Sequence, residues 1–270
     1  MQQATLNSIL AATRQRVAEL RPRARELERL AARAPEPPPL EGALGGTVVG
    51  VIAEVKRRSP SAGAIAEGLD PVAHAAAYAR GGAVAISVLT DELHFGGSLG
   101  DLERVAREVR LPVLRKDFIL DELQLLEARA AGASAVLLIV RAMEGGQLRQ
   151  LTATARELGL GVLMEAHTEE ELDQALGAEP TAVGVNSRDL GTFAVDLALA
   201  ARLLARVPPG IPVVAESGIE TRADVERLAA AGADLVLVGT AVARTPDPAA
   251  SVRALCGVPR RGRPGSGATV

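Results

Sequence analysis

An alternation of eight short apolar segments with helical stretches constrains the fold of this 270-residue chain more than any other feature. Each segment has the length of a strand and is rich in Val, Leu, Ile and Ala. Successive segments end about 20 to 35 residues apart, which leaves room for one crossover helix and two short loops. The strand candidates are 48–55, 83–89, 112–117, 134–140, 160–165, 182–186, 211–216 and 234–238. Such units predict parallel strands joined by helices.

Two α/β architectures use such units, an open doubly wound sheet and a closed barrel. An open sheet that binds a dinucleotide is expected to carry a Gly-rich loop after its first strand. Here the first strand runs instead into residues 54–61, Glu-Val-Lys-Arg-Arg-Ser-Pro-Ser, which contain no glycine. The sequence therefore predicts an α/β fold made of a single (β/α)8 TIM barrel.

Residues that start and end helices stand between the strand candidates. Asp70 before Pro71 predicts an N-cap, and so do Thr168 and Thr221, each with an acidic residue three positions later as in a capping box. Glycines that precede three of the strands are predicted to be left-handed C-caps: Gly82, Gly132 and Gly232.

Residues 1–40 are predicted to form an N-terminal helical extension and a Pro-rich connection. Apolar residues recur at near-helical spacing from about residue 5 to 33, and prolines at 35, 37, 38 and 39 then end any helix. The apolar stripe favours a helix docked across the barrel, residues 41–257, over an independent tail. Residues 258–270, rich in Arg, Gly and Pro, are expected to be a disordered tail.

Composition argues against several classes of partner. The chain has 30 Lys plus Arg against 33 Asp plus Glu, and its formal charge of −3 gives no reason to expect nucleic acid or an anionic membrane. With 1 Cys and 3 His, neither an internal disulfide nor a metal centre is expected. No apolar run approaches the roughly 20 residues of a spanning helix, and no signal segment is recognisable. We expect a cytoplasmic protein that is a monomer or a weak homo-oligomer.

Polar residues gather at the C-terminal ends of the strand candidates, where barrels carry their active sites. Glu54 and Lys56 end the first strand two positions apart, so both side chains point to the same side. The other strand-end groups are 115–117, Glu165, 186–188, 216–218 and 239–240. Charges that converge on one mouth are costly unless they are paired or functional, so we expect general acid–base catalysis there. Whether burial or the neighbouring carboxylates dominate the pKa of the lysines stays open.

The last two loops carry a second signal. Ser217 and Gly218 follow the seventh strand candidate, and Gly239 and Thr240 follow the eighth. Small residues let backbone N–H groups approach an anion, and barrels frequently bind phosphate between these two loops. The pair predicts a phosphorylated small-molecule substrate.

These residues lie in strings that closely resemble the indole-3-glycerol phosphate synthase family, which closes the indole ring in tryptophan biosynthesis. The resemblance spans roughly residues 1–256. Its most specific strings are 115–119, Arg-Lys-Asp-Phe-Ile, and 186–190, Asn-Ser-Arg-Asp-Leu. Other matching strings are 52–56, 59–61, 87–91, 95–98, 112–114, 163–167, 215–219 and 238–240.

The resemblance implies a reaction and a role for each site residue. The family converts 1-(2-carboxyphenylamino)-1-deoxyribulose 5-phosphate into indole-3-glycerol phosphate, with loss of CO2 and water and with no metal or organic cofactor. Lys116 is then the main general acid, which protonates the ketose carbonyl oxygen, and Glu165 assists proton transfer. Lys56 and Glu54 serve the later dehydration, and the order of the two lysines is left open. Glu216 and Asn186 complete the catalytic set: Glu216 holds the lysines and the substrate in place, and Asn186 together with Arg188 orients the substrate's hydroxyls and carboxylate. The other residues are expected to bind the substrate: Phe95 and Phe118 its anthranilate ring; Ser217, Gly218, Gly239 and Thr240 its phosphate; and Ser59.

Two other functions remain open. A relative of phosphoribosylanthranilate isomerase would share the fold and the phosphate site, but it would need a Cys and an Asp as its acid–base pair. A binding barrel without turnover would gain nothing from buried charge. His74 and His94 are expected to be structural or exposed, and a role for His167 in steadying Glu165 is a minor alternative.

Overall fold

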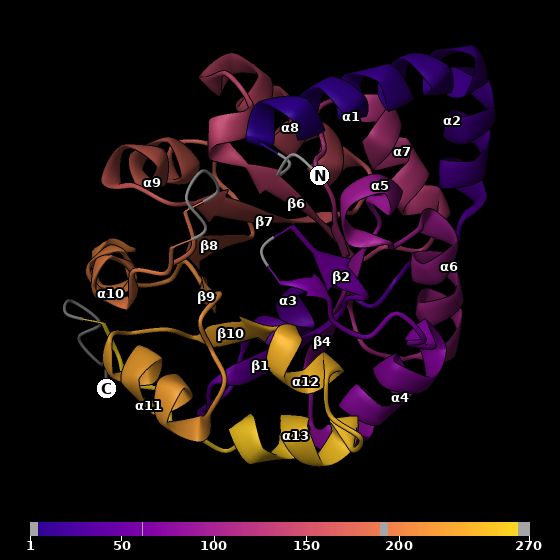
Figure 1. Cartoon of the computed structure of the whole chain (residues 1–270). Coiled ribbons are helices and arrows are strands. Elements are labelled where there is room, and N and C mark those ends of the chain that lie inside the picture. Colours follow the sequence, from indigo (N-terminus) through magenta and orange to yellow (C-terminus); the bar gives the residue numbers. More distant parts are fainter. Residues whose placement is uncertain (1–4, 61, 190–193, 264–270) are drawn as a thin grey trace.

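Eight parallel strands close into a barrel, which confirms the predicted fold (Figure 1). The structure is a computed structural model that describes residues 5–60, 62–189 and 194–263. Around the barrel the strands follow the order β1-β10-β9-β8-β7-β6-β5-β4, and β4 pairs back with β1. The strands are β1 (Gly50–Val55), β4 (Ala85–Leu89), β5 (Val113–Lys116), β6 (Ala135–Ile139), β7 (Gly161–Ala166), β8 (Ala182–Asn186), β9 (Val213–Glu216) and β10 (Leu235–Val238).

Helices follow the strands on the outside of the barrel (Figure 1). The longer ones are α4 (Pro71–Gly81), α6 (Leu99–Glu108), α7 (Glu122–Ala130), α8 (Gly145–Glu157), α9 (Glu169–Leu176), α10 (Leu197–Arg206), α11 (Arg222–Ala230) and α13 (Pro248–Leu255). Shorter elements lie in the loops at the C-terminal strand ends: the hairpin β2 (Arg58–Ser59) and β3 (Gly63–Ala64), α5 (Glu92–Phe95), η2 (Val140–Ala142) and α12 (Thr240–Ala243). Of the helices in the described ranges, none has the length and apolar character needed to cross a membrane.

The predicted helix boundaries are largely confirmed. Asp70 caps α4, Thr221 forms a reciprocal capping box with Asp224, and the three predicted glycines all adopt positive φ. Thr168 accepts a hydrogen bond from the backbone N–H of Glu171, as predicted. The predicted capping box is wrong in its second hydrogen bond, from the N–H of Thr168 to the Glu171 carboxylate. That carboxylate accepts from the N–H of His167 and faces the His167 ring instead.

The protein has two apolar cores, one inside the barrel and one between the barrel and its helices, and alternate side chains along each strand point into one or the other. On β1, Ile52 points into the barrel, where it packs in one buried cluster with Leu114 and Leu163, whereas Val51 and Ala53 face the helices in a second cluster. Two positions beyond Ile52, Leu114 and Leu163 stand the charged residues Glu54, Lys116 and Glu165. The period of two therefore points these charged side chains into the barrel mouth.

The N-terminal extension docks on the barrel, as the apolar stripe predicts, but it is not one helix. It consists of α1 (Leu6–Leu20), η1 (Arg21–Arg23) and α2 (Ala24–Arg33). Pro22 lacks an N–H and clashes with the preceding turn, so the chain tightens there into a 3-10 turn. In Figure 1 the indigo helices lie along the rim of the barrel, and both pack against α7.

Specific contacts hold the extension in place. Ile9 and Leu10 join the inner cluster, and Arg16 bridges to Asp117 at 2.8 Å. Farther along, Arg129 of α7 donates to the carbonyl oxygens of Ala34 and Pro35 at 2.9 and 2.8 Å. The chain thereby passes from the mouth to the opposite end of the barrel. There Leu40, with Ala43 and Leu44 of α3 (Glu41–Leu44), packs into the N-terminal end, or floor, of the barrel. The predicted domain boundary after residue 40 therefore falls inside this group of packed residues.

The segment after α13 differs from the expected disordered tail. Val258 is buried, and the guanidinium of Arg260 donates to the carbonyl oxygens of residues 44, 45 and 48. Arg263 is 8% exposed and pairs with Asp234 at 2.6 Å. These arginines satisfy carbonyl groups on the barrel floor, so residues 258–263 belong to the folded body. Residues 264–270 of the predicted tail lie outside the described residues.

We expect deletion of residues 1–33 to lower the melting temperature and to raise KM for the expected phosphorylated substrate several-fold. Removal of α1 exposes the apolar surface around Phe118 and leaves Asp117 without Arg16. Thermal unfolding and steady-state kinetics of the truncated chain test this. Leu30→Ala, at an exposed position of α2, serves as the control and should change neither quantity. A truncated protein with the full-length melting temperature and KM would show that the extension is dispensable.

Candidate active site

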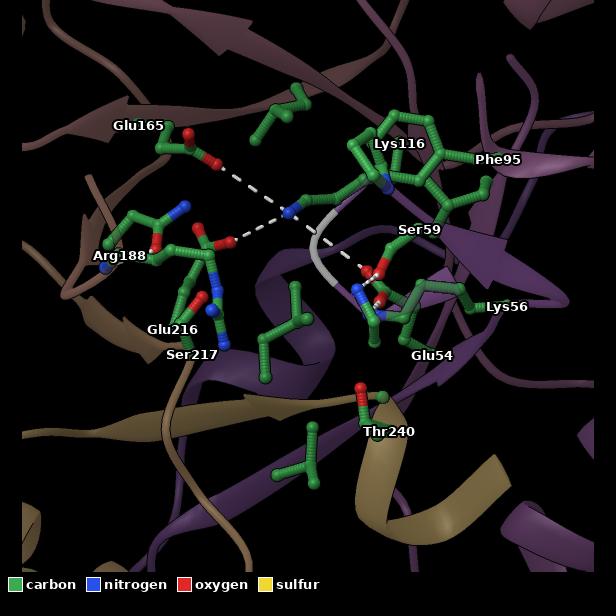
Figure 2. A pocket seen from close by; sticks show the side chains of 18 of the residues that line it. Glu54, Lys56, Ser59, Phe95, Lys116, Glu165, Arg188, Glu216, Ser217 and Thr240 are labelled. Carbon is green, nitrogen blue, oxygen red and sulfur yellow. Dashed lines mark hydrogen bonds and ion pairs between the residues drawn. The ribbon is translucent and has the colours of Figure 1, made fainter. Parts of the chain in front are cut away.

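A cavity of about 360 Å³ opens at the C-terminal ends of the strands (Figure 2). Its walls come from all eight strands of the barrel, from loops that follow several of them, and from α1. All of the predicted site residues line it: Glu54, Lys56, Ser59, Phe95, Lys116, Phe118, Glu165, Asn186, Arg188, Glu216, Ser217, Gly218, Gly239 and Thr240. Residues far apart in the sequence thus meet at one mouth.

Lys116 lies at the centre of the cavity's charged groups (Figure 2). Its side chain extends from the end of β5 and is 14% exposed. Its Nζ lies 2.9 Å from Glu216, 3.5 Å from Glu165 and 4.0 Å from Glu54. Three strands other than its own therefore each direct one carboxylate at this ammonium group.

These distances decide the protonation states that the sequence left open. Burial alone would lower the pKa of Lys116, but the three glutamates, Glu216 first, outweigh burial and raise that pKa well above its ordinary value. Lys116 is therefore protonated at neutral pH. Burial would raise the pKa of Glu165, but Lys116 and His167 hold it well below its ordinary value. Burial raises the pKa of Glu216 to about 7, because Lys116 offsets burial only in part. Beside the protonated Lys116, Glu165 is thus a charged carboxylate and Glu216 is a carboxyl group that titrates near neutrality.

Lys56 forms a second pair, with Glu54, at 2.6 Å. Glu54 interacts with both lysines, because its Oε1 pairs with Lys56 and its Oε2 lies 4.0 Å from Nζ of Lys116. Burial would raise the pKa of Glu54, but Lys56 and then Lys116 lower it below the ordinary range. Lys56 and Lys116 are the only two lysines among the 30 basic residues of the chain. Both stand in this cavity.

Two glycines leave space for the carboxylates. A Cβ atom at Gly184 of β8 would overlap Oε1 of Glu216, and one at Gly239 would overlap Oε1 of Glu54 and lie 2.9 Å from Nζ of Lys56. Gly239 has an ordinary negative φ, so its small size serves the Glu54–Lys56 pair as well as any anion. Gly184 was not among the predicted site residues. A glycine inside a strand, where it is disfavoured, was the available signal.

The two ends of the cavity differ in character. At one end the rings of Phe95 and Phe118 lie with centroids 6.3 Å apart, beside Leu6 and Ile9 of α1. These two residues of the extension were not among the predicted site residues, although they belong to the apolar stripe that predicts docking.

At the other end Ser217 and Gly218 both have positive φ, at 68° and 69°. Thr240 and Ala241, at the start of α12, line the same region, as does Arg244, which the sequence analysis also missed. One end thus offers apolar surface, and the other offers small residues and exposed backbone.

Arg115 and Asp117, on either side of Lys116, have a structural role. Arg115 is 1% exposed and donates to Thr90, Asp117, Glu127 and the carbonyl oxygen of Gln124. The Asp117 carboxylate, at the edge of the cavity, also accepts from Arg16 and Thr90, at 2.8 and 2.6 Å. This network anchors the end of β5, so Lys116 projects from a fixed backbone.

Comparison with known sequences identifies a family. A family model described as "Indole-3-glycerol phosphate synthase" matches residues 6–255. A protein of that name from Leifsonia xyli subsp. xyli is 52% identical over 228 residues, which cover 84% of this chain and 87% of that protein. Another protein of that name, from Mycobacterium avium, is 47% identical over 249 residues, which cover 92% of this chain and 92% of that protein.

Solved structures with low sequence identity share the fold. A 3-hexulose-6-phosphate synthase superimposes with a TM-score of 0.61 at 16% identity, over 77% of this chain and 98% of that one. Thiamine phosphate pyrophosphorylase from Pyrococcus furiosus gives a TM-score of 0.58 at 19% identity, over 80% of this chain and 95% of that one. At such identities the likeness concerns the barrel alone.

Proposed function

The chain belongs to the indole-3-glycerol phosphate synthase family, and we propose that the cavity at its barrel mouth is the site where the indole ring is closed. The reaction takes 1-(2-carboxyphenylamino)-1-deoxyribulose 5-phosphate to indole-3-glycerol phosphate with release of CO2 and water. It makes the protein a carboxy-lyase of tryptophan biosynthesis.

The observation that carries the proposed site is a protonated lysine held among three carboxylates. Ring closure at a ketose carbonyl needs an acid at the carbonyl oxygen; the attacking ring carbon then loses its carboxylate as CO2, and the dehydration that follows needs a base for the proton lost with water. Lys116 is charged and central, and Glu165 is a charged carboxylate 3.5 Å away. Composition adds support. Of 30 basic residues only these two mouth positions, 56 and 116, carry Lys, and arginine cannot replace lysine where a proton must be given up.

The other polar and charged residues of the cavity serve the later dehydration and hold the substrate. Glu54 and Lys56, paired at 2.6 Å, serve the dehydration. Glu216, 2.9 Å from Lys116, fixes the position of the lysine and contacts the substrate. Asn186 and Arg188, at the end of β8, orient the substrate's hydroxyls and carboxylate.

The two ends of the cavity set the direction of the substrate. The anthranilate ring lies at the apolar end, against Phe95 and Phe118. The phosphate lies at the opposite end, against Ser217, Gly218, Gly239 and Thr240, with Ser59 completing the wall. This orientation leaves the ketose carbon between the two ends, where Lys116 stands.

The isomerase alternative has little support. It would need a Cys near the mouth, but Cys256, which is the single cysteine of the chain, follows α13 and lies against the backbone of Gly81 and Gly82. The experiment described next distinguishes the proposed enzyme from a barrel that binds the substrate without turnover.

The test is incubation of the purified chain with the carboxyphenylamino-deoxyribulose phosphate. We expect an indole fluorescence signal and one CO2 for each substrate consumed. With 0 Trp and 1 Tyr, the protein itself contributes almost no background. Binding of the substrate without fluorescence change or CO2 would favour the binding barrel, and turnover of phosphoribosylanthranilate instead would favour the isomerase.

We expect Gly239→Val to lower kcat by about tenfold or more and also to raise KM. The added side chain would displace the Glu54–Lys56 pair as well as narrow the phosphate end, and a displacement of about 1 Å can cost up to ~100-fold. Gly146→Val, at an exposed position of α8 with open space around it, is the control. Single-turnover rates and the Kd of inorganic phosphate separate the two effects. Unchanged phosphate affinity together with an unchanged KM would refute the assignment of the phosphate end to this loop.

Location and assembly complete the proposal. We expect the protein to act in the cytoplasm as a monomer or a weak homo-oligomer, with the barrel as its single catalytic domain. Light scattering across a concentration series tests the assembly state, and a stable higher oligomer would contradict it.

A further inference from the structure

His167 is a buried ionisable residue that the proposed reaction does not yet use. It follows β7, its side chain is 3% exposed, and it is not among the residues that line the cavity. Its two ring nitrogens face two carboxylates. Nδ1 lies at hydrogen-bond distance, 3.2 Å, from Oε2 of Glu171, whereas Nε2 lies 3.2 Å from Oε1 of Glu165 in an ion-pair contact that lacks hydrogen-bond geometry.

The outer carboxylate of this arrangement is itself fixed. Glu171, in the first turn of α9, accepts the backbone N–H of His167 at 2.8 Å through Oε2 and the guanidinium of Arg141 at 2.8 Å through Oε1. Both of its oxygens are therefore occupied, and the imidazole ring cannot turn without losing a partner. A row of Arg141, Glu171, His167 and Glu165 thus leads from the outer loops to the mouth.

The inner carboxylate is divided between two partners. Oε1 of Glu165 faces His167, whereas Oε2 faces Lys116 at 3.5 Å. In Figure 2 the Glu165 carboxylate points toward Lys116 across the cavity. With Oε1 beside the imidazole, Oε2 is the oxygen that faces Lys116.

The charge of the ring follows from its neighbours. Burial alone would lower the pKa of His167, but Glu165 of β7 and Glu171 of α9 raise it to about 9, against a smaller opposing effect of Arg141. At neutral pH both ring nitrogens therefore carry protons. An imidazolium beside Glu165 favours the charged form of that carboxylate.

We propose that His167 is a positioning residue for the ring-closing reaction, which fixes the oxygen of Glu165 that faces the substrate and keeps that carboxylate charged. The role rests on the proposed function only in that Glu165 takes part in proton transfer. The histidine touches no substrate and acts through Glu165.

The kinetic test compares His167→Phe with His167→Gln. The amide nitrogen of Gln can replace Nε2 and hold Glu165 in place, but it carries no charge. We expect His167→Phe to lower kcat about tenfold at pH 7.5 with KM changed less than twofold, and His167→Gln to recover most of that loss. In both variants the acid limb of the kcat profile should move up by about one pH unit or more, because Glu165 loses a neighbouring positive charge. His74→Gln, on the outer face of α4, is the matched control.

A second measurement does not depend on activity. The chain has 3 His, so 15N-labelled histidine gives a spectrum that His74→Gln and His94→Gln variants assign. We expect His167 to be an imidazolium at pH 7.5 in the ligand-free protein, and Glu165→Gln to lower its pKa. A neutral His167 ring at pH 7.5, or an acid limb that stays unmoved in both His167 variants, would overturn the proposal. An inactive protein whose His167 is nonetheless charged would count against the proposed function and not against this arrangement.

Discussion

Replacement of Lys116 by either Met or Arg is expected to lower kcat by comparable factors of about 10²–10⁴ while KM changes far less. If Lys116 supplied only attraction for the substrate's anions, arginine would preserve it. If Lys116 gives its proton to the carbonyl oxygen, arginine fails, because its pKa above about 12 makes it a poor donor. The loss corresponds to roughly 3–5 kcal/mol of transition-state stabilisation.

The structure adds a geometric reason for the same outcome. The ammonium group sits within 4.0 Å of three carboxylates, and the wider, planar guanidinium cannot keep those three contacts from the same strand position. The carboxylates also raise the pKa of Lys116, so the lysine is fully protonated when the substrate arrives. Release of the proton then requires a substrate that takes the place of part of this carboxylate set.

Single-turnover kcat measured across pH is the appropriate experiment, because product release cannot then mask the chemical step. Lys56→Met is the matched comparison, as it removes the other lysine of the same mouth. Since the chain has only these two lysines, 15N-lysine spectra of each variant report directly on the group that remains. Near-wild-type turnover of Lys116→Arg would exclude the general-acid role and transfer it to Lys56.

The largest effect on stability is expected from Asp117→Ala. Its carboxylate is fully buried and accepts hydrogen bonds from Arg16, Arg115, Thr90 and the N–H of Phe118. Removal leaves Arg115, itself 1% exposed, with Glu127 as its remaining carboxylate partner, and it takes the Asp117 ion pair from Arg16 as well. Loss of one partner of a buried ion pair costs about 3–5 kcal/mol, which lowers Tm by roughly 10 °C in a protein of this size.

Chemical denaturation and thermal unfolding measure this cost. Glu103→Ala is the control, because its pair with Arg107 lies on the surface and should contribute less than about 1 kcal/mol. Equal effects of the two substitutions would contradict the structural role of Asp117.

The pH dependence of the Asp117 contribution has a definite sign. Burial would raise the pKa of Asp117, but Arg115 and Arg16 hold it below its ordinary value. Its stabilising effect is therefore complete above the unfolded-state pKa of about 4 and is lost as pH falls through the lower folded-state value. The difference in unfolding free energy between wild type and Asp117→Ala should shrink below about pH 4. A difference that stays constant down to the acid limit would contradict this account.

The sequence by itself determined the barrel, and it did so through short-range periodicity. Each apolar run is strand-length, and each gap holds one helix, so eight parallel units were predictable, and the absence of a Gly-rich loop after the first strand favoured the closed barrel over the open sheet. Alternation within a strand also determined that Glu54 and Lys56 share a side, and the structure pairs them at 2.6 Å. Caps such as Asp70 and Thr221 were equally predictable, because their partners lie within the next four residues.

Only the tertiary structure decided what the charged groups do to one another. The balance between burial and attraction at Lys116 depends on distances to three other strands, and those distances exist only once the barrel is closed. The same holds for Gly184, whose small size matters because Glu216 of the adjacent strand occupies the space beside it. It holds for Arg263, which was expected in a tail but reaches an aspartate 29 positions away. Periodicity is a property of neighbouring residues in the chain, whereas electrostatic interaction and steric exclusion fall off over a few ångströms in space, so only closure of the barrel could determine them.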